Sequence, residues 1–122
     1  MVQDRRHSPQ ARILFGAVTA LGPGKVELLE AIAETGSISG AARRMGMSYR
    51  RAWNLVDVIN KSFNRPLVVT SSGGRGGGGA EITQACREVL ARYRDIEAKA
   101  MASVEDEMAE FSTYLSEHAK QE

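Results

Sequence analysis

The chain has 122 residues, 43% of them hydrophobic, and a formal net charge of +1. This suits one soluble domain with at most an appended helix. One cysteine and two histidines exclude an internal disulfide and a cysteine/histidine metal centre, so we expect no cofactor. The sequence shows neither a signal peptide nor an apolar run near the ~18 residues of a membrane span, so we expect a cytoplasmic protein.

The charges are unevenly distributed along the chain. Residues 37–80 hold seven basic residues and one acidic residue, a net charge of +6, whereas residues 81–122 have a net charge of −5. A basic middle segment indicates a surface for a polyanion such as DNA, with salt-dependent affinity. An ordinary solvated run of charges would look the same on charge alone.

The chain begins with a polar stretch, residues 1–10, which we expect to be a flexible arm. The apolar segment 11–18 predicts a strand, ended by Leu21-Gly22-Pro23-Gly24. Residues 25–35 predict a helix, which Gly36 ends because glycine tolerates positive φ.

Residues 36–63 predict two helices joined by a tight turn. Ser39 is expected to cap the first, which ends before Gly46, and Ser48 to cap the second, over 49–63. The second helix opens with an aromatic residue and two arginines. This is the layout of a helix-turn-helix whose second helix enters the DNA major groove. The residues expected to face the core recur at helical spacing: Val26, Leu28, Leu29, Ile32, Ala33, Ile38, Ala41, Ala42, Met45, Ala52, Val56, Ile59 and Phe63.

After Pro66, two short strands at 67–70 and 80–82 flank the glycine-rich stretch 71–79, which predicts a β-hairpin wing. Thr83 is expected to cap a final helix from Gln84 to about Leu115. About 32 residues of helix would be roughly 48 Å long, more than this chain can cover, so a second copy is expected to cover it.

The final helix carries a heptad-like apolar repeat, which we name the C-terminal seam and expect to pair two subunits. Its members are Cys86, Val89, Tyr93, Ile96, Ala100, Val104, Met108 and Phe111. An extra residue interrupts the repeat near 101–104. Cys86 is interpreted as a small apolar residue of this seam and not as a redox sensor.

The predicted fold class is therefore mostly α with a small β component. The expected divisions are a flexible arm at 1–10, a winged helix-turn-helix at 11–82, a long dimerisation helix at 83–117 and a tail at 118–122.

The segment GSISGAARRMGMSYRRAWNLVDVINKSFNRPLV, followed by GGRGGGGAEITQACREVL, resembles the N-terminal DNA-binding domain of the ModE-type molybdate-responsive transcriptional regulators. That domain is a LysR-type winged helix-turn-helix. The resemblance covers about residues 12–93. It implies a homodimer that reads a pseudo-palindromic DNA site. The residues it assigns to DNA contact are Ser39, Ser48, Tyr49, Arg50, Arg51, Asn54 and Arg75.

One departure from that family concerns the ligand. Its full-length members carry molybdate-binding domains after the dimer helix, whereas this chain ends at Glu122. We therefore do not expect this chain to bind molybdate. Met1 and the polar end favour a stand-alone protein over a domain fragment.

Several motifs admit a second interpretation. Arg50 and Arg51 can contact guanine or phosphate, or simply begin a solvated helix. Arg75 can enter a minor groove or sit on a mobile hairpin tip. The glycine run also matches the dinucleotide-binding pattern, but no strand follows the helix to complete a βαβ unit. Trp53 either positions the helix at the DNA backbone or covers the edge of the core, which we favour.

No nucleophile, base and orienting group can be assembled from these residues, so the chain is not expected to be an enzyme. The first functional hypothesis is a homodimeric, sequence-specific DNA-binding regulator. The second is a protein-interaction or dimerisation module whose basic face is incidental. A third, less favoured, is direct oxyanion sensing.

Overall fold

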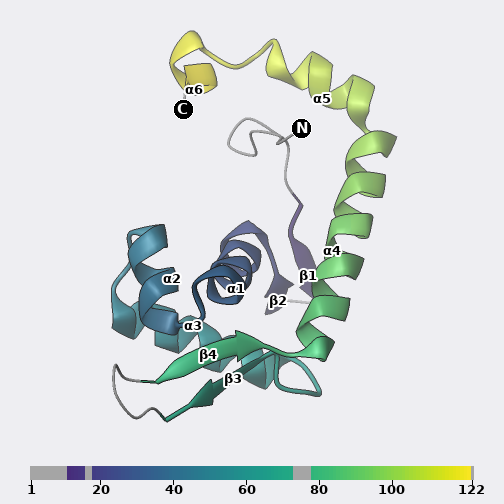
Figure 1. Ribbon diagram of the computed structural model, residues 1–122. Helices are drawn as coiled ribbons and strands as arrows, with labels where there is room; N and C mark the ends of the chain where they lie inside the picture. The colour runs from purple at the N-terminus through teal and green to yellow at the C-terminus, as the bar shows by residue number, and fades with distance from the viewer. Residues whose placement is uncertain (1–10, 16–17, 73–77, 122) are drawn as a thin grey trace.

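The computed structural model of the chain describes residues 11–15, 18–72 and 78–121. Figure 1 shows these residues as a group of helices with two small antiparallel sheets and a long helix, α4, along one edge. This confirms the predicted class, mostly α with a small β component, and the winged helix-turn-helix arrangement. The predicted arm and the DNA-contact candidate Arg75 lie outside the described residues.

The N-terminal apolar segment forms a hairpin, so the single strand predicted over 11–18 is wrong. β1 (Ile13–Phe15) pairs antiparallel with β2 (Val18–Leu21). A lone strand would leave its backbone N–H and C=O groups unpaired, and the residues that follow supply the partner. The break at Gly22 and Pro23 therefore ends the second strand of a hairpin.

Helix α1 (Pro23–Thr35) has proline in its first turn, where a missing N–H costs no hydrogen bond. It ends at Gly36, whose φ of 75° is readily adopted by glycine alone. The Gly36 N–H donates to the Ile32 carbonyl over 2.9 Å. The predicted glycine stop is confirmed.

Helix α2 (Ile38–Met45) is capped by Ser37, so the predicted cap at Ser39 is wrong. The Ser37 Oγ accepts from the Gly40 N–H over 2.9 Å. Gly36 leaves α1 in the left-handed region, so the next residue is already extended and takes the capping position. Ser39 then lies within the first turn of the helix.

Helix α3 (Tyr49–Ser62) begins as predicted. Gly46 closes α2 with φ of 67°, and the Ser48 Oγ accepts from the Arg51 N–H over 3.0 Å. The turn between α2 and α3 is therefore set by Gly46, which ends α2, and by Ser48, which caps α3. α2 and α3 pack against each other and against α1.

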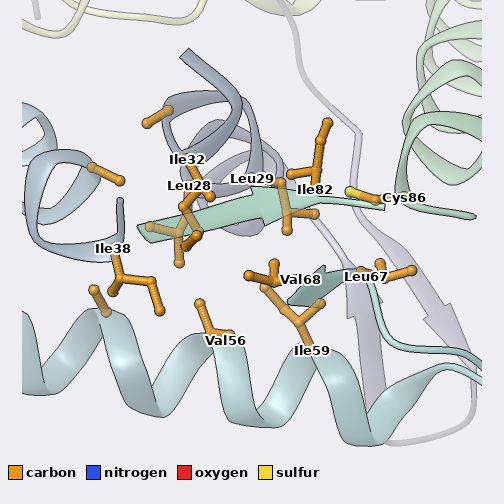
Figure 2. Packing of buried hydrophobic residues seen from close by; sticks show 14 of the residues in the cluster. Leu28, Leu29, Ile32, Ile38, Val56, Ile59, Leu67, Val68, Ile82 and Cys86 are labelled. Carbon is orange, nitrogen blue, oxygen red and sulfur yellow. The ribbon is translucent and has the colours of Figure 1, made fainter. Parts of the chain in front are cut away.

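The core lies between α1, α2, α3, the wing and the start of α4. Figure 2 shows Val56 and Ile59 of α3 pointing toward Leu28, Ile38 and Val68. Most residues predicted to face the core are buried, namely Leu28, Leu29, Ile32, Ile38, Ala41, Ala42, Ala52, Val56 and Ile59. Val26 is buried too, and Met45 and Phe63 are half-buried against the core. Ala33 is exposed, so the prediction that it widens the inward face of α1 is wrong.

The wing is formed by β3 (Val68–Ser71) and β4 (Gly79–Ile82), which pair antiparallel. The Ala80 N–H donates to the Gly36 carbonyl over 2.9 Å, so the second wing strand is attached to the end of α1. The wing therefore keeps a defined position beside the helix-turn-helix.

Helix α4 (Gln84–Ser103) starts at the predicted cap. The Thr83 Oγ1 accepts from the Cys86 N–H over 3.1 Å and donates to the Pro66 carbonyl over 2.8 Å.

No helix in the described part of the chain is long and apolar enough to cross a membrane.

The prediction of one continuous helix to Leu115 is wrong. The helix breaks at Val104 (φ −123°, ψ 21°), followed by α5 (Glu105–Ser112) and α6 (Glu117–Gln121). The break falls where the apolar repeat has an extra residue, at which a straight helix could not keep both halves of the repeat on one face. α5 bends away from the α4 axis (Figure 1).

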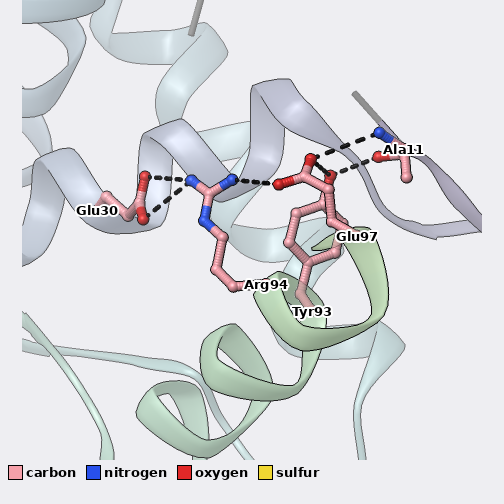
Figure 3. A network of polar contacts seen from close by, with 5 residues as sticks. All are labelled: Ala11, Glu30, Tyr93, Arg94 and Glu97. Carbon is pink, nitrogen blue, oxygen red and sulfur yellow. Dashed lines mark hydrogen bonds and ion pairs between the residues drawn. The ribbon is translucent and has the colours of Figure 1, made fainter. Parts of the chain in front are cut away.

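Arg94 attaches α4 to α1. Its Nη2 lies 2.9 Å and 3.1 Å from the two carboxylate oxygens of Glu30, and its Nη1 lies 3.0 Å from Glu97 Oε1 (Figure 3). The pKa of Arg94 is raised: burial opposes its charge, but the hydrogen bonds and charges of the two glutamates outweigh burial. Tyr93 donates to the Ala11 carbonyl, which holds the N-terminal segment against the same helix.

Candidate nucleic-acid interface

The outer side of α3 carries the polar residues predicted to contact DNA. Tyr49, Arg50, Arg51 and Asn54 are all exposed, while Ala52 between them is buried. The buried residues Ala52, Val56 and Ile59 form the inward face of α3 and leave these four side chains accessible. Their contact with DNA stays a prediction.

The charge on this surface is partly neutralised within the chain. Arg44 pairs with Glu34 of α1, and Lys61 pairs with Asp57 one turn earlier over 2.8 Å. Within the described residues, Arg50 and Arg51 form no ion pair. Because cations near a helix N-terminus are disfavoured by the helix dipole, an external anion would stabilise this arrangement.

The two serines predicted to contact DNA differ in what their side chains do. The Ser48 Oγ already accepts from a backbone N–H as the cap of α3. Ser39 is exposed in the first turn of α2, with its Oγ 3.4 Å from the Ser37 Oγ. A hydroxyl has lone pairs and one proton, so either serine can still donate to a phosphate oxygen.

Trp53 is more exposed than the interpretation as an edge of the core implied. Its side chain is 38% exposed, and its ring centroid lies 6.4 Å from that of Tyr49. Together with wing residues, these two rings line a notch between α3 and β3. Sequence reasoning missed this notch because it forms only where α2, α3 and the two wing strands meet.

Fewer residues of the C-terminal seam are exposed than predicted. Cys86 and Tyr93 are 0% and 1% exposed in the chain's own core, so they are not available to a second subunit. Tyr93 also donates to the Ala11 carbonyl of the N-terminal segment, and Cys86 belongs to the core cluster at the start of α4. Ile96 is 48% exposed, and Met108 and Phe111 are exposed on α5. Val89, Ala100 and Val104 are half-buried.

An open apolar groove of about 430 Å³ lies where α4 passes the N-terminal hairpin and the end of α3. Its lining includes Ile13, Leu21, Phe63, Val89 and Ile96. The groove thus joins the exposed seam residues of α4 to apolar residues of other elements. The C-terminal seam was predicted from the spacing along one helix, so it did not include the apolar residues that other elements contribute to the groove.

Burial raises the pKa of the Cys86 thiol to about 11 and outweighs the charge of Arg87, which lowers it. A thiol with so high a pKa is almost wholly protonated at neutral pH, and only the thiolate is an effective nucleophile. This agrees with the interpretation of Cys86 as an apolar packing residue.

Comparison with known proteins also indicates that the helix-turn-helix region is the functional one. A model of bacterial regulatory helix-turn-helix proteins of the lysR family matches residues 24–87. The chain is 45% identical over 73 residues to the molybdenum-pterin-binding protein MopA of Rhodobacter capsulatus, across 60% of this chain and 28% of MopA. It is 40% identical over 87 residues to the molybdenum transport protein ModE of Azotobacter vinelandii, across 71% of this chain and 32% of that protein.

The chain is also 36% identical over 90 residues to the DNA-binding transcriptional dual regulator ModE of Escherichia coli K12, across 71% of this chain and 34% of that protein. The chain therefore spans about a third of the length of these curated relatives.

Proposed function

Because the chain belongs to the lysR family of bacterial regulatory helix-turn-helix proteins, we propose that it binds a pseudo-palindromic DNA site as a homodimer. The resemblance to ModE-type regulators predicted from the sequence is confirmed, as is the prediction that this is a regulator's DNA-binding domain and not an enzyme. The observation that carries the proposal is the start of α3, which is exposed and whose arginines form no ion pair with any residue that the structure describes. In it, Tyr49, Arg50, Arg51 and Asn54 are all exposed within the first two turns of a capped helix.

Each α3 would enter one major groove, with Arg50 or Arg51 placed for bidentate contact with guanine and the other residues for base edges or phosphate. Ser39 and Ser48 would contact phosphates beside it. Arg75, on the wing, would contact the adjacent backbone or minor groove.

The homodimer is supported by the exposed remainder of the seam and by the apolar groove. Ile96 and the neighbouring groove residues would lose their contact with water if a second copy packed its α4 there. Pairing two domains on one axis gives two recognition helices related by a twofold, which matches a pseudo-palindrome.

The proposal for this chain concerns DNA and not molybdate. Two of the relatives named above carry names that refer to molybdenum, and the chain spans about a third of their length. We expect no heat of molybdate binding when this chain is titrated in a calorimeter. A protein that regulates bacterial genes acts on DNA in the cytoplasm, which is where we place it.

The decisive experiment is a genomic selection followed by titration. Fragments retained by the protein are sequenced, and affinity for the recovered duplex is measured against a scrambled duplex at several salt concentrations. We expect the recovered fragments to share a palindromic motif and each duplex to bind one dimer. The logarithm of the binding constant should fall linearly with the logarithm of the salt concentration. Equal, weak binding to both duplexes would instead favour the protein-interaction module with an incidental basic face.

A further inference from the structure

Helix α5 exposes apolar side chains that no described part of its own chain covers. Met108 and Phe111 are 38% and 60% exposed, and Leu115, just after the helix ends, is 42% exposed. Residues three apart share one face of a helix, so Met108 and Phe111 form an apolar stripe. A helix as short as α5, with eight residues, is marginal in water by itself. A surface that received the stripe would stabilise it.

The rest of α5 is acidic. The helix holds Glu105, Asp106, Glu107 and Glu110 and no basic residue, and none of these carboxylates forms an ion pair with a residue that the structure describes. At about 100° per residue, Glu105 and Glu107 flank the apolar stripe, one on each side, while Asp106 and Glu110 lie toward the opposite face. The surface that complements α5 is therefore an apolar groove with basic edges.

The groove beside α4 has this composition. Its lining is mainly apolar, and its charged members are Arg65, Glu88 and Arg92. Both arginines are exposed, and neither forms an ion pair within the described part of the chain. Arg65 follows the end of α3, whose 14 residues span about 20 Å. It is therefore far from the start of α3, which is proposed to contact DNA.

The α5 of the same chain does not occupy this groove. The groove is lined on α4 by residues from Ala85 to Ile96, whereas α5 begins at Glu105, beyond the break at Val104, and contributes no lining residue. Figure 1 shows α5 at the end of α4 that is far from the wing. If two α4 helices paired antiparallel about Ile96, residue 104 of one copy would lie opposite residue 88 of the other. The partner's α5 would then begin beside the groove.

We propose that each α5 docks into the groove of the second copy, with Met108 and Phe111 on its apolar lining and Glu105 and Glu107 near the arginines. This inference rests on the proposed function and deepens it, because it names the segment of the second copy that the groove receives. It also assigns Arg65 to subunit contact and not to DNA. Salt screens the attraction between exposed charges, so the dimer should weaken as ionic strength rises.

Exchanging the charges of the two surfaces tests this docking. One variant, Arg65→Glu with Arg92→Glu, makes the groove acidic, and the other, Glu105→Lys with Glu107→Lys, places cations beside the stripe. Each variant alone sets like charges against each other at both copies of the contact. At low salt its dimer dissociation constant, measured by sedimentation, should rise at least about tenfold.

An equimolar mixture of the two variants should dimerise again, to within about threefold of the wild type. In the mixed dimer the acidic α5 meets the unchanged basic groove, and the altered α5 meets the acidic groove. The matched control, Asp106→Lys with Glu110→Lys, makes the same charge change on the opposite face of α5 and should weaken the dimer much less. All the altered positions are exposed, and circular dichroism establishes that the variants are folded.

The possible outcomes separate the docking from the proposed function. A mixture that stays monomeric, or a control that weakens the dimer as much as Glu105→Lys with Glu107→Lys, would overturn the inference. A dimer that neither variant weakens would overturn it too, and would leave a homodimer paired through α4 alone. A wild-type chain that is monomeric and binds no duplex would overturn the proposed function together with the inference.

Discussion

The side chain of Asn60 pairs with the backbone of Val68 in both directions. Its Nδ2 donates to the Val68 carbonyl over 3.0 Å, and its Oδ1 accepts from the Val68 N–H over 3.1 Å and from the Leu67 N–H over 2.8 Å. A primary amide thus takes the place of a neighbouring strand. It joins the last turns of the recognition helix to the first strand of the wing.

Removing this amide should destabilise the domain. Asn60→Ala leaves the N–H groups of Leu67 and Val68 without their acceptor, and both residues are buried. We expect a loss of about 2–3 kcal/mol in the free energy of unfolding, measured by urea titration. Asn64→Ala, at an exposed asparagine four residues later, is the matched control and should change stability little. Equal effects of the two substitutions would contradict this role for Asn60.

Arg50→Ala should weaken operator binding by about 1–3 kcal/mol if the side chain reads a base. Arg50 is exposed and forms no ion pair in the described part of the chain, so the melting temperature should not change. Gel shifts at one fixed salt concentration measure the effect. An unchanged operator affinity would remove Arg50 from the interface.

Ile96→Glu should dissociate the proposed homodimer. The residue is 48% exposed and lines the apolar groove, and a twofold interface would bury a carboxylate from each subunit. We expect at least about a tenfold increase in the dimer dissociation constant by sedimentation or light scattering, since burying an isoleucine contributes roughly 1.5–3 kcal/mol.

Val58→Glu is the control for Ile96→Glu, because Val58 is 47% exposed on α3 and does not line the groove. It adds the same charge at a similar exposure. A wild-type protein that is monomeric at micromolar concentration would argue against the dimer altogether.

Cys86 should make stability depend on pH in the alkaline range. Its folded pKa is about 11, above the ordinary value of 9.0, so the folded state holds the proton more tightly. The stabilisation is fully present below pH 9.0 and is lost as the pH rises toward about 11. The loss is on the order of 2–3 kcal/mol.

Cys86→Ala isolates this contribution from other groups that titrate at high pH. The variant should be less stable than the wild type near neutral pH, and the difference should shrink between pH 9 and about 11. Chemical denaturation at several pH values measures both. A constant difference across this range would show that burial does not hold the thiol neutral.

Arg94→Met keeps an apolar stem but removes the guanidinium that joins α4 to α1. Glu30 and Glu97, both partly buried, then lose their hydrogen bonds with the guanidinium. We expect the free energy of unfolding to fall by about 1–3 kcal/mol. Combining it with Glu30→Gln completes a double-mutant cycle, and additive effects would contradict a direct interaction.

The tertiary structure revised several predictions that concerned one segment at a time. Ser37 caps α2 because Gly36 ends α1 one residue earlier, a fact about the junction of two helices. Tyr93 continues the heptad repeat by spacing, yet it is buried against the N-terminal segment. Trp53 reads as an edge of the core by helical position, yet it lines a notch with the wing.

The sequence by itself determined the helix starts at Ser48 and Thr83, the glycine stops at Gly36 and Gly46, the inward faces of three helices, and the family. These depend on contacts within about four residues or on a motif that stays contiguous. The tertiary structure alone decided which seam residues remain exposed, how Asn60 holds the wing, and that Trp53 faces a polar notch. These depend on which distant segments meet, and burial and hydrogen bonding are settled only when they do.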